Sequence, residues 1–144
     1  MSAFEIFTAR TDDEIRRCFP VMVELRPHLE IGTFVERVRR QERDKGFVLA
    51  ALQVAGLVQS VAGYWVAEFL AWGRILYVDD LVTREDARSQ GYGQKLLAWL
   101  IERAREAGCD ELHLDSGVQR FGAHRFYLRS GMDITCHHFA MKLR

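Results

Sequence analysis

A short glycine-containing run over residues 88–93, with the sequence Arg-Ser-Gln-Gly-Tyr-Gly, constrains the fold of this chain most. It stands between an apolar, strand-like segment over residues 75–83 and a strongly periodic helical segment over residues 94–107. Glycines at a strand-to-helix junction let backbone N–H groups surround an anion, and the helix behind them adds unpaired N–H groups and the positive end of its dipole. The sequence therefore predicts a loop that binds a phosphate or a pyrophosphate.

Two helices are predicted in the first half of the chain from the same start signal. Thr11 and Glu14 form a capping box, and Thr33 and Glu36 repeat it. The first helix is expected to end near residue 27, where a proline stands, and the second near residue 45, where Gly46 follows.

The strands are predicted from apolar runs and from alternation of apolar and polar residues. They cover residues 4–7, 47–54, 57–66, 75–83, 111–115 and 134–143. A short helix over residues 123–129 precedes the closing strand, and Ala55-Gly56 turns the second and third strands into a hairpin. This order predicts an α+β fold with antiparallel hairpins and one central β-α-β unit.

Composition and charge narrow the class of protein. The 144 residues fit one domain over residues 1–144, and 20 basic against 20 acidic residues leave no net attraction for nucleic acid or an anionic membrane. No run approaches the ~20 apolar residues of a membrane span. Three widely spaced cysteines (Cys18, Cys109 and Cys136) indicate a reducing, cytoplasmic setting rather than a disulfide framework. No His, Cys, Asp or Glu cluster has metal-ligand spacing, so no metal is expected.

Two signatures in this order resemble the GNAT superfamily of acyl-CoA-dependent N-acetyltransferases. The first is the Gln/Arg-x-x-Gly-x-Gly/Ala pattern, present at residues 88–93, and the second is similar to Ala-x-x-Phe-Tyr-x-x-x-Gly-Phe, present at residues 123–132. The resemblance implies a mixed, mostly antiparallel sheet that is splayed near its middle and flanked by about four helices. It also implies acetyl transfer from acetyl-CoA to the primary amine of a small molecule, by direct attack in a ternary complex.

The last quarter of the chain also resembles the aminoalkylphosphonate and small-amine acetyltransferases of this superfamily. The chain departs from the family pattern at three positions: Ser89 replaces a common Gly, Arg120 a common Asn, and Met132 the usual Phe. None of these changes removes a backbone N–H from the predicted loop. The loss of Asn at position 120 affects one side-chain contact to the cofactor arm.

The resemblance assigns the cosubstrate to particular residues. The backbone of Leu81, Val82 and Thr83 would bind the pantetheine arm like an added strand, and N–H groups near Val82 would polarise the thioester carbonyl. Arg120 and Tyr127 would also contact the cosubstrate. The pyrophosphate would lie on Arg88, Ser89, Gln90, Gly91, Tyr92 and Gly93.

Catalytic roles follow from the same resemblance and from the chemistry of the side chains. Tyr127 matches the family tyrosine that protonates the departing sulfur. Asp79, Asp80 and Asp115 are candidates for the base that takes the amine proton, although carboxylates near strand ends also serve as turn or cap residues. Successive strand residues face opposite ways, so at most one of Asp79 and Asp80 is expected to face the cleft. The alternatives for the base are His113, His124, His137 and His138.

The acceptor side is less defined by sequence. Glu24, Arg26 and His28 end the first helix, where this fold usually shapes the acceptor site. An aromatic stretch (Tyr64, Trp65, Phe69 and Trp72) forms either core packing or a wall of the acceptor pocket. The acceptor itself is a small amine, or alternatively a protein N-terminus or lysine, and a non-catalytic acyl-CoA sensor is the rival from another class. The closing strand has apolar positions that would allow pairing in a homodimer.

Overall fold

The computed structural model describes residues 3–144, which divide into two compact units, a first that ends at His113 and a second of Leu114–Arg144. A five-stranded sheet has the order β1-β2-β3-β4-β5, and its first four strands pair antiparallel in sequence. The strands are β1 (Glu5–Thr8), β2 (Val48–Val54), β3 (Leu57–Phe69), β4 (Gly73–Thr83) and β5 (Glu111–Leu114).

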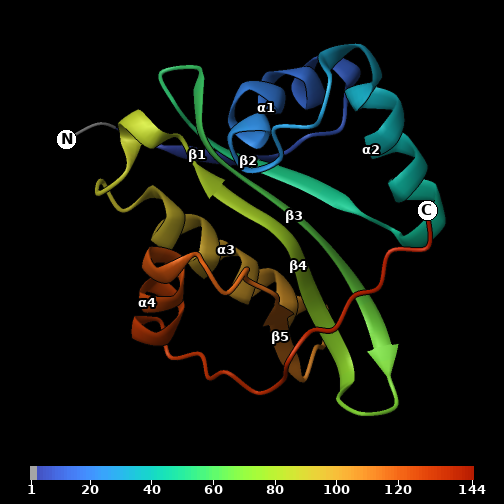
Figure 1. Ribbon diagram of the computed structural model, residues 1–144. Helices are drawn as coiled ribbons and strands as arrows, with labels where there is room; N and C mark the ends of the chain where they lie inside the picture. Colours follow the sequence, from blue (N-terminus) through green and yellow to red (C-terminus); the bar gives the residue numbers. More distant parts are fainter. Residues whose placement is uncertain (1–2) are drawn as a thin grey trace. The chain divides into compact units, whose positions relative to one another are not determined.

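Helices cover both faces of the sheet in the first unit. They are α1 (Asp12–Leu25), α2 (Ile31–Lys45), a single-turn 3₁₀ helix η1 (Glu85–Ala87) and α3 (Tyr92–Glu106). Helices α1 and α2 lie on one face and α3 on the other, and α3 connects β4 to β5 (Figure 1). The second unit contains α4 (Phe121–Arg129). In the part of the chain that the structure describes, no helix is both long and apolar enough to cross a membrane.

The core forms where the amphipathic helices bury their apolar stripes against the sheet. On the α1–α2 face, Ile15, Cys18 and Phe34 are buried, and Leu49 and Val61 meet them from the strands. The buried stripe of α3, with its three- and four-residue spacing, consists of Leu96, Leu97, Leu100 and Ala104. Apolar side chains are therefore packed on both faces of the sheet.

Of the two predicted helix starts, one is confirmed and the other is wrong. Glu14 N–H donates to the Thr11 hydroxyl and the Glu14 carboxylate accepts from Thr11 N–H, which completes the capping box. Helix α2 instead begins at Ile31 with Glu30 as its N-cap, and none of the described side chains caps it. The Thr33 hydroxyl points back to the Glu30 carbonyl, so Thr33 already belongs to the first turn.

The strand predicted over residues 134–143 is wrong. Residues 132–144 form no helix or strand, and the apolar side chains of Ile134, Phe139, Met141 and Leu143 are exposed. The apolar positions change from even to odd numbers between Cys136 and Phe139, so one strand could not place them all on one face. No described strand supplies ladder partners for this segment. Its pairing with a second copy of the chain stays a prediction.

A β-bulge interrupts the β3–β4 ladder beside the centre of the sheet. Gly63 pairs with Asp80, but the next residue, Tyr64, pairs with Val78, so Asp79 is skipped in the backbone ladder with β3. A Cβ on Gly63 would lie 2.7 Å from the Asp80 carboxylate and would also collide with the Phe47 ring. Glycine is therefore the residue that makes room for the carboxylate at this point of the sheet.

Candidate active site

The backbone of the predicted phosphate loop includes two left-handed residues. Arg88 is extended, Ser89 has a left-handed φ of 72°, and Gly91, the N-cap of α3, has a φ of 82°. Among the residues that the structure describes, no side chain caps the first turn of α3. The first N–H groups of a helix have no intrahelical partner, so this turn retains donors for an anion.

Short-range contacts hold the loop in place. The Arg88 side chain donates to the Thr83 carbonyl at 3.5 Å, and the Tyr92 hydroxyl donates to the Gln90 side chain at 3.1 Å. A Cβ on Gly93 would lie 3.2 Å from the Thr83 hydroxyl, so the end of β4 and the start of α3 approach closely. A shallow hollow of about 250 Å³ beside the loop is lined by Leu57, Gln59, Arg84, Asp86, Ala87, Gln90 and Tyr92.

Hydrogen bonds show which backbone groups at the end of β4 face β3. Arg84 N–H donates to Gln59 of β3 at 2.8 Å, and the Val82 carbonyl accepts from the Ser60 hydroxyl of β3 at 2.9 Å. Because backbone direction alternates along a strand, the N–H and C=O of Leu81 and Thr83 point to the other edge of β4. The Arg88 contact to the Thr83 carbonyl agrees with this direction.

Asp80 lies on the side of the sheet that α1 and α2 cover. The Arg26 guanidinium, at the C-cap of α1, donates to the Asp80 carboxylate at 3.0 Å and to the Asp79 carbonyl at 2.9 Å. The Asp80 side chain is only 15% exposed. Burial raises the pKa of this carboxyl, and the Arg26 guanidinium offsets part of that effect.

Asp79 lies on the same side as Asp80, so the expectation that the two face opposite ways is wrong. The Asp79 carboxylate accepts from the ammonium of Lys45, at the end of α2, at 2.7 Å and from the Trp65 indole N–H at 2.9 Å. The cause is the bulge, which shifts the alternation of β4 by one residue at this point. Both carboxylates are thereby brought together with Arg26 and Lys45.

The aromatic stretch is divided between the two faces of the sheet. Tyr64 is buried and packs edge-on against Trp99 of α3. Trp65 faces the other way, where its ring is stacked on Tyr77 with centroids 5.8 Å apart. Core packing is therefore confirmed for Tyr64, whereas Trp65 lies beside the Asp79 carboxylate, and its role as a wall of an acceptor pocket stays a prediction.

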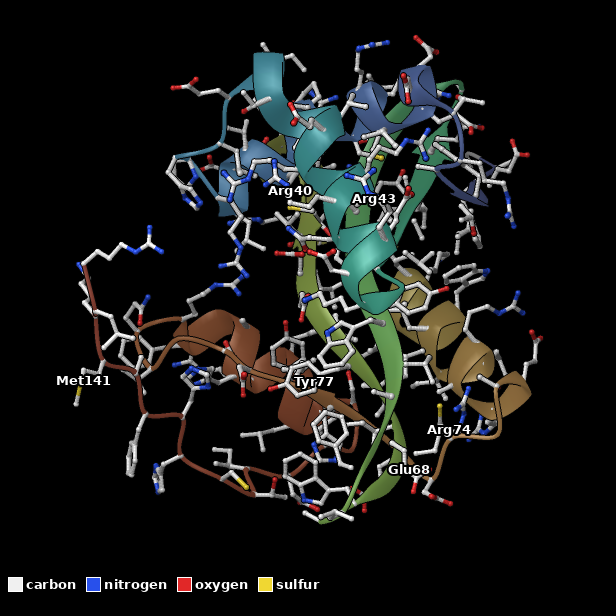
Figure 2. The ribbon with its side chains drawn as sticks, turned by 90° about the vertical axis from the view of Figure 1, so that its right-hand side faces the viewer. Arg40, Arg43, Glu68, Arg74, Tyr77 and Met141 are labelled. Atoms are coloured by element: carbon white, nitrogen blue, oxygen red, sulfur yellow. The ribbon has the colours of Figure 1, made fainter. Side chains whose placement is uncertain are left out.

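The remaining rings continue from Trp65 toward the β3–β4 turn. Phe69 lies 6.0 Å from Trp65 and 5.4 Å from Trp72, and His113 of β5 lies 4.3 Å from Trp72 and 6.3 Å from Tyr77. Figure 2 shows Tyr77 on β4, between α2 with Arg40 and Arg43 and the hairpin end with Glu68 and Arg74.

The two other residues predicted at the end of α1 do not join this cluster. The Glu24 carboxylate accepts from Glu85 N–H at 2.8 Å and so fixes the 3₁₀ turn before the phosphate loop. His28 is exposed. Of the three residues predicted at the end of α1, only Arg26 contacts the carboxylates.

The second unit holds Tyr127 on α4. Burial raises the pKa of its phenol, and the guanidinium of Arg120, the N-cap of α4, offsets part of that effect. The phenol is therefore protonated well above neutral pH and able to donate a proton. In the same unit, Asp115 pairs with His138 at 3.4 Å, and the His124 ring contacts the Gly117 carbonyl at 2.8 Å.

A model of the acetyltransferase (GNAT) family matches residues 8–132, a span that runs through both units. The chain belongs to the GNAT family. Its sheet with flanking helices is the GNAT fold, and the chain is an acyl-CoA-dependent N-acetyltransferase.

Individual relatives agree with the family assignment. The uncharacterized N-acetyltransferase YhdJ of Bacillus subtilis (strain 168) is 36% identical over 115 residues, which are 80% of this chain and 81% of the relative. The aminoalkylphosphonate N-acetyltransferase of Salmonella typhimurium (strain LT2) is 44% identical over 54 residues, 38% of this chain and 35% of that protein. The solved aminoglycoside N-acetyltransferase AAC(6')-Iy in complex with CoA has a TM-score of 0.86 at 12% identity, covering 100% of this chain and 97% of that one.

Three side chains of this GNAT chain that lie against the carboxylates or the neighbouring rings were not placed there from the sequence. Lys45 was expected only as a helix end, Tyr77 only as a strand residue, and His113 only as a surface or core histidine or a base. They reach the cluster from α2, β4 and β5, whose ends are far apart in sequence. No sequence pattern within one helix or strand predicts that these side chains lie close together. Among the described residues, no three His, Cys, Asp or Glu side chains gather in a way that would hold a metal ion.

Proposed function

We propose that the chain transfers the acetyl group of acetyl-CoA to the primary amine of a small molecule, by direct attack within a ternary complex. The observation that carries the proposal is the uncapped start of α3 behind a loop with two left-handed residues, Ser89 and Gly91. Such a loop suits a pyrophosphate, which is the charged centre of coenzyme A. The solved relative with bound CoA supports the choice of cosubstrate.

The proposed cosubstrate site extends from the loop along β4. Residues 88–93 would bind the pyrophosphate through backbone N–H groups. The alternation at the end of β4 favours Leu81 and Thr83 over Val82 for hydrogen bonds to the pantetheine arm and the thioester carbonyl, because the Val82 carbonyl faces β3. Arg120 and Tyr127 remain proposed contacts of the cosubstrate from the second unit.

The proposed reaction needs one base and one acid. Asp80 takes one proton from the bound ammonium, directly or through water, and the neutral amine nitrogen then attacks the thioester carbonyl carbon. The C–S bond breaks, and the nitrogen's second proton leaves through water. Tyr127 gives its proton to the departing thiolate. Asp80 is favoured because its raised pKa makes it a better proton acceptor than an ordinary carboxylate. Asp115 is the second candidate for the base, and its partner His138 would hold it in place.

The first experiment measures thiol release from acetyl-CoA across a panel of primary amines, with calorimetric binding of acetyl-CoA alongside. The panel contains arylalkylamines, aminoalkylphosphonates, polyamines, aminoglycosides and peptides. Thiol release with a small amine supports the proposal. Release with peptides alone would replace the small amine by a protein acceptor. Binding without release on any amine would favour an acyl-CoA sensor, and absence of binding would overturn the proposed role of residues 88–93.

The role of Tyr127 is tested by Tyr127→Phe, which removes the proton and keeps the ring. Proton donation to a leaving group contributes roughly 10²- to 10⁴-fold, so kcat should fall by that order while the Kd for acetyl-CoA stays within about twofold. Tyr64→Phe is the matched control for aromatic hydroxyl loss, because Tyr64 is buried against Trp99 of α3 and has no proposed part in the reaction. An unchanged kcat in Tyr127→Phe would remove this residue from the reaction.

A further inference from the structure

A contiguous aromatic surface borders the two half-buried carboxylates, Asp79 and Asp80, in the first unit. We call it the aromatic platform, and it consists of Trp65, Phe69, Trp72, Tyr77 and His113. Neighbouring ring centroids lie 4.3–6.3 Å apart, and each ring is half-buried, so each keeps an exposed portion. Stacked and tilted rings at this spacing form a continuous aromatic surface on which another ring can pack.

The chain already places a primary ammonium at the edge of the platform. The Lys45 ammonium lies 4.9 Å from the centre of the Trp65 ring and 2.7 Å from the Asp79 carboxylate. A carboxylate together with an aromatic face is a recognised environment for a cation. The Trp65 indole N–H fixes the other Asp79 oxygen, so the carboxylate is oriented toward the ammonium. This position is therefore suited to the ammonium of an acceptor that displaces Lys45.

The charges around the platform argue against an anionic acceptor. Arg26 is paired with Asp80, and Lys45 is paired with Asp79, so these four groups balance. A phosphonate or carboxylate would have to share Arg26 or Lys45 with the carboxylate that each already binds, and it would be repelled by both carboxylates. A neutral aromatic group needs no cationic partner and is not repelled by the carboxylates.

We propose that the acceptor is a primary arylalkylamine, with its ring on the aromatic platform and its ammonium at Asp79 in the place of Lys45. The inference rests on the proposed acetyl transfer and names the substrate class of the same site. In that position the amine lies at the residue adjacent to Asp80, the proposed base. The proposal also makes Lys45 an internal competitor of the acceptor rather than part of its binding site.

The test compares 2-phenylethylamine with 2-aminoethylphosphonate, which share a two-carbon amine and differ in the distal group. Calorimetry measures the Kd of each amine for the protein loaded with CoA, and thiol release measures kcat/KM. We expect 2-phenylethylamine to be favoured at least about tenfold in both, because one buried ring contributes that much. Equal values, or preference for the phosphonate, would overturn the inference.

Two pairs of variants assign the preference to the platform. Trp65→Leu should weaken the binding of 2-phenylethylamine roughly 3- to 30-fold. Trp99→Leu, which removes a ring from the other face of the sheet, should leave the Kd of this amine unchanged. Lys45→Met should strengthen the binding of 2-phenylethylamine, whereas Lys142→Met should not change it. Weaker binding in Lys45→Met, or equal loss in both tryptophan variants, would overturn the inference.

Failure of this inference differs from failure of the proposed function. The amine Kd is measured without turnover, so a protein that never releases thiol still reports whether the platform binds an aromatic amine. Thiol release with a polyamine or a phosphonate, and no binding of 2-phenylethylamine, would keep the acetyltransferase proposal and remove the arylalkylamine.

Discussion

The phosphate loop and the carboxylate cluster are built in opposite ways. The loop consists of consecutive residues, and its side-chain contacts join partners two to five positions apart. The cluster joins Arg26 to Asp80 across 54 positions and Lys45 to Asp79 across 34. The loop offers backbone donors, which most substitutions preserve, whereas the cluster offers side chains, which single substitutions remove. One region is therefore suited to a constant cosubstrate and the other to a selected acceptor.

The largest expected effect concerns the cluster. Asp80→Asn removes the proposed base, so kcat/KM should fall roughly 10²- to 10⁴-fold while the Kd for acetyl-CoA stays the same. In the unmodified protein, activity should decline as the pH falls through the raised pKa of Asp80, because a protonated carboxyl cannot accept the amine proton. Steady-state rates against pH measure both effects.

The control for this variant is Asp12→Asn, which also removes an ion-paired carboxylate, here the partner of Arg39 at 2.8 Å. It should leave kcat/KM and the pH profile unchanged. If Asp80→Asn kept the acid limb of the profile, another group, such as Asp115, would be the base.

The next largest effect concerns the loop and should appear in the affinity for acetyl-CoA rather than in kcat/KM. Gly91→Ala places a Cβ at a φ of 82°, and Gly108→Ala does the same at a φ of 72° at the other end of α3. Both should lose about 1 kcal/mol of unfolding free energy. Only Gly91→Ala should also weaken the binding of acetyl-CoA, by roughly 5- to 100-fold.

Calorimetry with acetyl-CoA and thermal unfolding separate these two outcomes. Equal acetyl-CoA affinity in the two glycine variants would mean that the backbone of residue 91 does not bind the cosubstrate. The amine Kd should be the same in both.

A smaller effect is expected in stability at the bulge. Gly63→Ala directs a Cβ into the Phe47 ring and to 2.7 Å from the Asp80 carboxylate, so the unfolding free energy should fall by about 1–3 kcal/mol. Gly32→Ala, in the first turn of α2 with no atom within 4 Å of the new Cβ, should be neutral or stabilising by up to about 1 kcal/mol. Denaturant unfolding measures both, and a neutral Gly63→Ala would contradict the tight packing around Asp80.

The smallest expected effect tests whether loop side chains matter. Ser89→Gly and Ala55→Gly each replace a residue that has a left-handed φ, of 72° and 50° respectively. Each should change the unfolding free energy by less than about 1 kcal/mol, and the acetyl-CoA Kd should stay within about twofold in both. A tenfold weaker Kd in Ser89→Gly alone would mean that this side chain binds the cosubstrate and that the loop is not a backbone site.

The features that sequence predicted well are those set by neighbouring residues. The turn at Ala55-Gly56 has left-handed φ at both positions, as a tight hairpin turn requires, and the Thr11–Glu14 box starts α1 as expected. The loop at residues 88–93 follows from its glycines in the same way. Each of these depends on contacts within about five residues.

The features that sequence missed depend on partners far along the chain. The bulge at Asp79 arises in a ladder with β3, so alternation within β4 alone gave the wrong face. Thr33 had the right spacing for a cap, but α2 starts earlier, at Ile31, and the Thr33 hydroxyl donates to the Glu30 carbonyl within the first turn. Residues 134–143 have a strand-like composition without a strand to pair with. The carboxylate cluster is made from four separate elements, so no one of them predicts it.

The measurement that tests the central claim most directly is the initial rate as acetyl-CoA and 2-phenylethylamine are varied together. If the loop and the carboxylate cluster hold both substrates at once, double-reciprocal plots will intersect, and protein incubated with acetyl-CoA alone will gain no acetyl mass. Parallel lines with an acetylated protein would show a covalent intermediate and would contradict direct attack.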